Sequence, residues 1–165
     1  MPQIDLNRGV PIPASLLQPE LVRLLTAIEA ARPPFEEFPI SVDLGDLHLP
    51  NAGVISVPIE LHCYEHDVPP DAPIGFGFQA KQRGALFPKF AGALSVEPAG
   101  SPHSCVRLRG EYEPPMGAVG KILDATVLRS VAERSLRAFL AQLTSEAETS
   151  VRRREAEVAQ ARRFA

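Results

Sequence analysis

The sequence has few of the features that mark secreted, membrane-spanning or metal-binding proteins. It contains only two cysteines in 165 residues, Cys63 and Cys105, which are too few for a disulfide framework. No apolar run approaches the roughly 20 residues that span a bilayer. The first residues also lack the basic and apolar regions of a secretory signal. We therefore predict a cytoplasmic protein with reduced cysteines and without stable membrane insertion.

Positive charge is scarce over most of the chain. The formal net charge is −3, which provides no electrostatic basis for binding nucleic acid, and we predict no nucleic-acid partner. The charge is uneven, because residues 151–165 hold five arginines against two glutamates and carry +3, which leaves −6 (−3 minus +3) elsewhere. The arginines are interleaved with glutamate and alanine, as in a solvated tail, although a partner-binding basic face is the alternative.

Nucleotide, hydrolase and metalloprotease motifs are missing. There is no P-loop, G-x-S-x-G or H-E-x-x-H pattern. The glycines of Gly75–Gly77 belong to a strand pattern, where glycine marks a bulge or close packing rather than a dinucleotide site. His62 and His66 would lie about 13 Å apart on an extended strand, too far to share one ion. We predict no metal, no cofactor and no identifiable catalytic residue.

The N-terminal part predicts one strand and one helix. Residues 3–8 alternate in polarity as a short strand does, and prolines follow. Ser15 is the expected helix N-cap, with Gln18 as its capping-box partner. Leucines then recur at helical spacing until Pro33 and Pro34 end the helix.

Five strand candidates follow with no helix between them. Their apolar residues alternate cleanly with polar ones, which predicts an antiparallel sheet with one solvated face. The candidates span residues 38–49, 54–66, 74–83, 87–97 and 105–113.

The C-terminal part predicts one long amphipathic helix that begins near Ala118, just after the last strand. If it ran unbroken to Phe164 it would contain about 47 residues and measure about 70 Å. Because that exceeds the width of a domain of this size, its last turns must overhang, fray or meet another chain. We therefore expect a domain over residues 1–145 and a charged helical extension over 146–165.

A sheet with a single apolar face must cover that face, and only the C-terminal helix is long enough. Strong twist curls a sheet around such a helix. The curvature leaves space between the layers, lined by aromatic and aliphatic side chains as in small-molecule pockets.

Three strings carry a resemblance to a known superfamily: FPKFAGALSVEP, VRLRGEYEPPMGAVGKILD and VAERSLRAFLAQL. Together with the element order they resemble the START-like, or SRPBCC, superfamily, and in particular uncharacterised bacterial SRPBCC proteins, over roughly Ile4 to Leu143. The superfamily includes lipid-transfer domains, plant pathogenesis-related proteins and bacterial polyketide cyclases. The resemblance implies an α+β helix-grip fold, with a curved antiparallel sheet of about six strands wrapped round a long C-terminal helix. Only one short N-terminal helix is evident here, where the superfamily commonly has two. The strings mark the fold and carry no catalytic residue.

The leading functional hypothesis is a binding module for a hydrophobic or amphipathic small molecule, such as a lipid, a polyketide or an isoprenoid-like compound. Its expected cavity lies between the sheet and the C-terminal helix. Tyr112 is of most interest, because its hydroxyl can orient a ligand in an apolar space. The expected ligand-binding residues are Phe76, Phe78, Phe90, Leu94, Leu108, Tyr112, Leu128 and Val131.

Two alternatives stay open at this point. One is an enzyme of the polyketide cyclase or dehydratase kind, for which Tyr112 and Cys63 are the only inward titratable groups. The other is an interaction or assembly protein that uses the basic helical tail to bind a partner, for example a second copy of the chain in a homodimer. Val151, Val158 and Phe164 form a thin apolar stripe along that tail.

Overall fold

The computed structural model describes residues 2–33, 35–43, 45, 53–83, 87–113 and 125–163. Within these ranges the chain forms six strands and two helices, in the order expected from the sequence. The elements are β1 (Gln3–Val10), α1 (Ala14–Glu29), β2 (Pro39–Asp43), β3 (Val54–Cys63), β4 (Ile74–Ala80), β5 (Lys89–Pro98), β6 (Ser104–Glu113) and α2 (Ala125–Arg163).

The six strands form one sheet in the order β1-β6-β5-β4-β3-β2, and every neighbouring pair is antiparallel. The predicted strands are confirmed, but several boundaries differ. β3 stops at Cys63 rather than His66, and β4 stops at Ala80 rather than Arg83. The prediction of a strand as far as residue 49 extends beyond the described residues, as does the expected helix start near Ala118.

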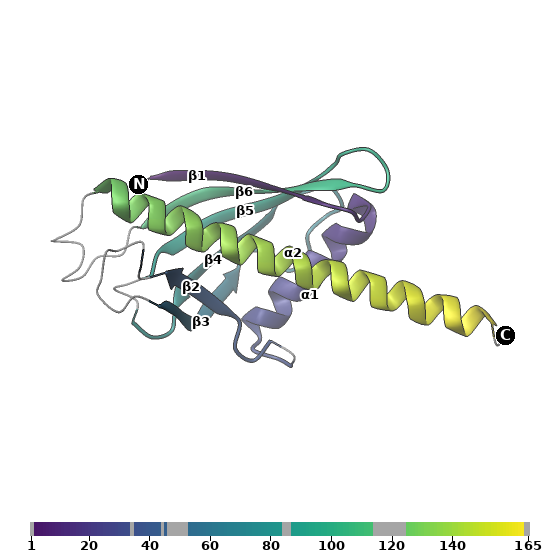
Figure 1. Ribbon diagram of the computed structural model, residues 1–165. Coiled ribbons are helices and arrows are strands. Elements are labelled where there is room, and N and C mark those ends of the chain that lie inside the picture. Colours follow the sequence, from purple (N-terminus) through teal and green to yellow (C-terminus); the bar gives the residue numbers. More distant parts are fainter. Residues whose placement is uncertain are drawn as a thin grey trace.

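The long helix α2 lies across the concave face of the sheet (Figure 1). It contacts β1 and β6 at one edge of the sheet and β2 at the opposite edge. Because both edges approach the same helix, the sheet must curl around it. This arrangement is the helix-grip α+β fold that the sequence predicted.

Helix α1 packs on α2, β3 and β5. The capping box predicted for its first turn is wrong. The helix begins at Ala14 after Pro13, with no side-chain cap. Gln18 is buried and instead binds the loop before β4. Its Nε2 donates to the carbonyl oxygens of Pro69 (3.1 Å) and Ala72 (3.0 Å), and its Oε1 accepts from the Asp71 N–H (2.8 Å). A buried amide must satisfy all its polar atoms, and the loop backbone offers more partners than the helix end does.

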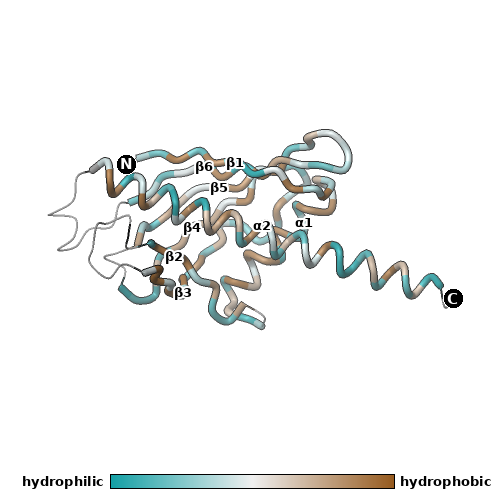
Figure 2. The backbone as a smooth tube through the Cα atoms, in the orientation of Figure 1, coloured by the Kyte–Doolittle hydropathy of each residue, from teal (hydrophilic) through white to brown (hydrophobic). Residues whose placement is uncertain are grey.

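The core lies between the sheet and the two helices, and hydrophobic and hydrophilic residues alternate along both layers (Figure 2). On α2 the buried positions continue as far as Val151. Beyond that point, Arg154 of α2 pairs with the buried carboxylate of Glu20 on α1 (2.8 Å), which also pairs with Arg23 of α1 (2.6 Å). The pair between Glu20 and Arg154 attaches the second half of α2 to α1.

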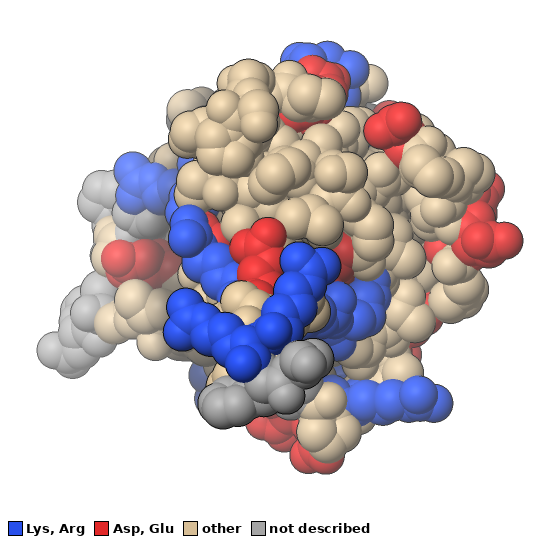
Figure 3. Space-filling view, turned by 90° about the vertical axis from the view of Figure 1, so that its right-hand side faces the viewer, with Lys and Arg blue, Asp and Glu red and all other residues tan. Residues whose placement is uncertain are grey.

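Residues 152–163 of α2 are all exposed, and this end of the helix projects beyond the sheet (Figure 1). Lysine and arginine side chains gather around it, with acidic side chains between them (Figure 3). Among the described residues, neither helix contains an apolar stretch long enough to cross a membrane.

Candidate functional site

The predicted ligand-binding residues all lie in the interior, on β4, β5, β6 and α2. Cross-strand register brings several of them together. Phe78 lies opposite Phe90, and Phe90 lies opposite Tyr112, so the three form a row across the concave face. Leu94 and Leu108 are opposite each other in the same two strands. Leu128 and Val131 approach from α2, and Leu128 is the most exposed of the eight at 9%.

The centre of this interface is filled by aromatic rings. Phe139 of α2 lies 4.8 Å from Phe78 and 6.1 Å from Phe76, measured between ring centroids. It also meets Phe38, which precedes β2, edge to face at 5.6 Å. Phe139 and Phe38 are not among the ligand-binding residues expected from the sequence. Their spacing along the chain gave no sign that they converge, because the curl of the sheet brings them together.

Away from this ring cluster, near the start of α2, the hydroxyl of Tyr112 is buried and has no hydrogen-bond partner among the described residues. A buried polar group without a partner costs about 1–3 kcal/mol. Burial raises the pKa of this phenol, and its other electrostatic influences are Arg129, which lowers the pKa, and Glu133, which raises it. The hydroxyl therefore stays protonated at neutral pH.

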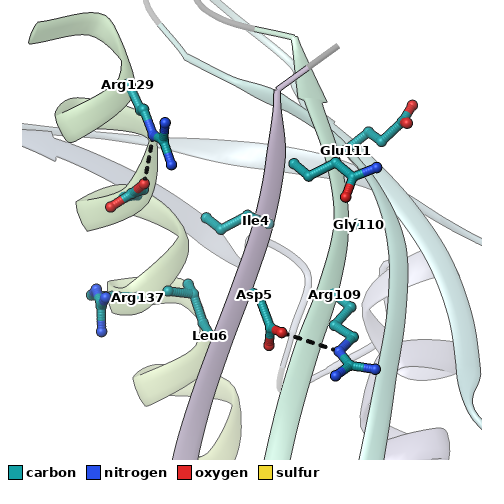
Figure 4. Close-up of a pocket in the computed structure, with 10 residues that line it drawn as sticks. Ile4, Asp5, Leu6, Arg109, Gly110, Glu111, Arg129 and Arg137 are labelled. Atoms are coloured by element: carbon teal, nitrogen blue, oxygen red, sulfur yellow. Dashed lines mark hydrogen bonds and ion pairs between the residues drawn. The ribbon is translucent and has the colours of Figure 1, made fainter. Parts of the chain in front are cut away.

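Arg129 and Glu133 also line a groove of about 670 Å³ between α2 and the edge strand β1 (Figure 4). Their ion pair, 3.0 Å long, joins successive turns of the helix. The apolar wall is formed by Ile4 and Leu6, whose side chains point from β1 toward α2 (Figure 4). The sequence analysis assigned no role to these two charged residues, and nothing in the sequence indicated that they would face β1.

Cys63, the second titratable residue expected to face inward, is buried at the end of β3. Burial, together with the nearby carboxylate of Glu29, raises the pKa of the thiol to about 12. A thiol with this pKa supplies almost no thiolate at neutral pH, and the thiolate is the nucleophilic form.

His62 and His66 are both exposed, but the separation of about 13 Å expected on an extended strand is wrong. Because β3 ends at Cys63, the chain bends before His66, and both rings converge on Glu29 at the end of α1. His62 Nδ1 lies 2.9 Å from Glu29 Oε1, and His66 Nε2 lies 2.7 Å from Glu29 Oε2. Within the described part of the chain, no group of three or more His, Cys, Asp or Glu residues is arranged to hold a metal ion.

Solved structures share this architecture at low sequence identity. A protein from Thermus thermophilus is 14% identical, with a TM-score of 0.53, and the match covers 90% of this chain and 99% of that chain. A conserved protein from Geobacillus kaustophilus is 13% identical, with a TM-score of 0.50 and coverage of 90% and 97%. The Zhui aromatase/cyclase from a Streptomyces species is 17% identical, with a TM-score of 0.49 and coverage of 91% and 95%.

No protein-family model matches the chain, and no curated protein sequence matches it either. At these identities the structural matches establish the fold alone, and the fold is the helix grip expected from the sequence.

Proposed function

We propose that the protein binds a hydrophobic or amphipathic small molecule, such as a lipid, a polyketide or an isoprenoid-like compound, between the concave face of the sheet and the first turns of α2. In this proposal Tyr112, Leu128 and Val131 surround the polar end of the ligand. The apolar part of the ligand contacts the remaining predicted residues, which are Phe76, Phe78, Phe90, Leu94 and Leu108.

The observation that carries the proposal is the buried, unpaired hydroxyl of Tyr112. The other predicted ligand-binding residues are apolar, so a ligand that contacts them gains about 25 cal/mol for each Å² of apolar surface removed from water. A ligand oxygen that accepts a hydrogen bond from Tyr112 also removes the cost of the unpaired group. Together these interactions favour a molecule that is mostly apolar and has a polar group at one end.

Binding without catalysis is the simpler form of this proposal. A cyclase-like enzyme needs a titratable group in the ligand space, and the inward residues supply only Tyr112 and Cys63. The pKa of each is raised, mainly by burial, so neither provides an anionic nucleophile or base at neutral pH. No observation among the described residues supplies a different base.

Two measurements test the binding function. Organic extraction of natively purified protein followed by mass spectrometry should recover an apolar compound. Titration with Nile red, a neutral apolar probe, should give saturable binding that weakens at least about tenfold in Val131→Phe, because the larger ring occupies the ligand space. Val158→Phe, on the exposed end of α2, is the matched control and should bind as the wild type does. Absence of saturable Nile red binding in the wild type would refute the proposal.

Tyr112→Phe gives a second test that does not depend on knowing the ligand. The substitution removes an unpaired buried hydroxyl and keeps the ring, so the ligand-free protein should become more stable by about 1 kcal/mol in urea unfolding. A loss of stability would mean that the hydroxyl is already satisfied within the protein, which removes the observation on which the proposal rests.

Assembly through the end of α2 is a second candidate, favoured by one observation. Val158 is 53% exposed and Leu16 of α1 is 42% exposed, and both line an apolar groove of about 420 Å³ together with Val151 and Ala159. A homodimer that buries this surface should appear as twice the monomer mass in light scattering. Deletion of residues 155–165 should return the mass to that of the monomer, and a wild-type monomer at high concentration would exclude this candidate.

A further inference from the structure

β1 is the longer and more regular of the two edge strands. It pairs only with β6, over all eight of its residues and without a bulge. The opposite edge strand, β2, has five residues and begins with a proline. Natural sheets protect their edges with short strands, prolines, bulges or lysines, because a free edge offers unpaired N–H and C=O groups to any extended chain. Residues 3–6 of β1, which line the groove next to α2, have none of these protections.

The hydrogen-bond register shows which backbone groups of β1 are free. The Tyr112 N–H donates to the Pro2 carbonyl oxygen (3.1 Å), so the backbone groups of Ile4 pair with β6. The backbone groups of Gln3 and Asp5 therefore point to the free edge, where they have no backbone partner among the described residues. These N–H and C=O groups are available to a seventh strand beside the groove.

The α2 wall of the groove has nearly the same spacing as one face of a strand. It is formed by Arg129, Glu133 and Arg137, each about 6.0 Å along the helix from the next. Alternate side chains of a strand are about 6.6 Å apart. A strand added to β1 would direct every second side chain toward α2, as β1 directs Ile4 and Leu6 (Figure 4). These side chains would meet the three residues of the α2 wall in turn.

The charges of the α2 wall favour an acidic occupant. Glu133 is paired with Arg129 through the arginine Nε (3.0 Å), an interaction that does not use the two Nη nitrogens. Arg137 has no ion-pair or hydrogen-bond partner in the part of the chain that the structure describes. The wall therefore carries a net charge of +1 (two arginines minus one glutamate).

The acidic residues on the sheet side of the groove do not cancel this charge. Asp5 pairs with Arg107 (2.5 Å) and Arg109 (3.2 Å) on the outer face of the sheet. Glu111 points away from α2 (Figure 4). These four residues sum to zero (two arginines minus two acids), so the net charge around the groove stays that of its α2 wall.

We propose that an extended peptide segment with acidic side chains adds to the free edge of β1 as a seventh strand, in the groove between β1 and α2. Main-chain hydrogen bonds to Gln3 and Asp5 supply affinity, as in other cases of strand addition. Carboxylates four residues apart in the peptide meet Arg129 and Arg137 and supply specificity. This interaction does not depend on the proposed small-molecule binding, since none of the eight predicted ligand-binding residues lines the groove.

The sheet of a second copy fits this groove less well than a peptide. One of its edge strands, β1 or β2, would have to supply the added strand. The side chains on the concave side of these strands are apolar and buried in their own core, as Ile4, Leu6, Ile40 and Val42 are. They would leave Arg137 unpaired. The partner is therefore a segment that is not itself part of a folded sheet.

The test measures fluorescence anisotropy at low salt with a labelled peptide, Gly-Thr-Glu-Thr-Thr-Thr-Glu-Thr-Gly. Its two glutamates lie on one face of a strand, four residues apart. A matched peptide has glutamine at both positions. The wild type should bind the Glu peptide saturably and about fivefold more tightly than the Gln peptide, as expected from two exposed charge pairs.

N-methylation of the peptide tests main-chain pairing without altering the protein. A strand pairs with a neighbour through the N–H groups of alternate residues, which point to one of its edges. Two versions of the Glu peptide are methylated at alternate backbone nitrogens, one at odd and the other at even positions. Only one version should lose binding, by at least about tenfold. Equal effects of the two patterns would overturn strand addition.

Arg137→Gln should remove most of the preference for the Glu peptide and leave the affinity for the Gln peptide unchanged. Arg153→Gln is the matched control on the projecting end of α2, because Arg153 is exposed and also lacks an ion-pair partner among the described residues. An equal loss of preference in the two variants would replace recognition in the groove by a general attraction to positive charge, and the assignment would fall.

Two substitutions of one residue test the edge of β1. Asp5→Pro removes the N–H that faces the free edge and keeps the hydrogen bonds to β6, whereas Asp5→Ala removes the same carboxylate and keeps the N–H. The proline variant should bind the Glu peptide at least about fivefold more weakly than the alanine variant.

The remaining outcomes separate this proposal from the small-molecule function. Absence of saturable binding of the Glu peptide to the wild type refutes the proposal, and a doubled mass in light scattering that Asp5→Pro abolishes would assign the edge to a second copy instead. Nile red binding should be the same with and without the Glu peptide, so its failure would count only against the small-molecule function.

Discussion

Gly92 of β5 and Gly110 of β6 lie opposite each other, and the ring of Phe90 covers both. A Cβ atom at Gly92 would lie 2.6 Å from the Gly110 Cα and 2.7 Å from Phe90 Cζ, and it would also overlap the Arg109 carbonyl oxygen. The absence of side chains at these two positions leaves room for the ring, since a Cβ at Gly110 would also come within 2.8 Å of Phe90 Cε2. At the residue scale, these glycines therefore determine how close Phe90 comes to its neighbours.

Gly92→Ala should consequently destabilise the protein by about 2–3 kcal/mol or more, because the clashing atoms belong to the backbone and cannot move independently. Urea unfolding measures this change. Gly9→Ala is the control, since a Cβ at Gly9 meets nothing within 4 Å, and it should change stability by less than about 0.5 kcal/mol. Equal effects of the two substitutions would show that close packing is not the reason for glycine at residue 92.

Phe139 is the second residue whose role is decided by packing. Its ring contacts three other phenylalanines and has 1% exposure. Phe139→Ala should cost about 3–5 kcal/mol in the free energy of unfolding. Since the substitution also opens space beside Phe76 and Phe78, it should increase the amount of Nile red bound by folded protein at low temperature. Unchanged stability would contradict the ring contacts described above.

At the scale of elements, Glu29 joins the end of α1 to the end of β3. Its Oε1 accepts a hydrogen bond from the Cys63 N–H (2.9 Å), and both carboxylate oxygens meet a histidine ring. Burial by itself raises the pKa of Glu29, but the Cys63 N–H and the neighbouring His66 and His62 outweigh it and hold the pKa below its ordinary value. The ionised carboxylate therefore stabilises the folded state.

This lowered pKa predicts a pH dependence with a definite sign. The contribution of Glu29 is complete above the unfolded pKa, about 4.3 for glutamate, and is lost as the pH falls through the lower folded value. Glu29→Gln should cost about 1 kcal/mol near pH 6, and the difference from the wild type should shrink below about pH 4. Urea unfolding between pH 3 and 7 measures it, with exposed Glu157→Gln as control. A difference that stays constant over this range would contradict the prediction.

At the scale of the whole molecule, α2 has two parts with different surroundings. Up to Val151 the helix is buried on one side, and Arg154 still pairs with Glu20, whereas residues 155–163 are exposed. The first part belongs to the core by these contacts. These contacts favour a boundary between domain and extension after Arg154, whereas the sequence predicted that boundary at residue 145.

Two truncations make that comparison. A chain that ends after Arg154 should keep the wild-type free energy of unfolding within about 0.5 kcal/mol. A chain that ends after Ser145 loses the buried Val151 and Ala147 and leaves Glu20 without Arg154, so it should lose at least about 3 kcal/mol. Equal stability of the two chains would place the boundary at residue 145.

The order of the elements, the antiparallel sheet and the inward face of each strand followed from the sequence, because polarity alternates with period two in strands and near 3.6 in helices. The same alternation identified all eight expected ligand-binding residues as interior ones. Whether they bind a ligand stays a prediction. Two predictions were wrong, the capping box of α1 and the strand separation of His62 and His66. Both relied on local geometry, and both were overridden by partners distant in sequence, such as Pro69 for Gln18 and Glu29 for His66.

By itself, the sequence determined which apolar side chains leave water, because their burial follows from the local pattern of polarity. Only the tertiary structure decided which of them meet. The ring cluster around Phe139, the pairing of Glu20 with Arg154 and the position of the Arg129–Glu133 pair facing β1 all depend on the curl of the sheet around α2. That curl is a collective result of twist and packing over six strands, so no short segment of the chain contains it.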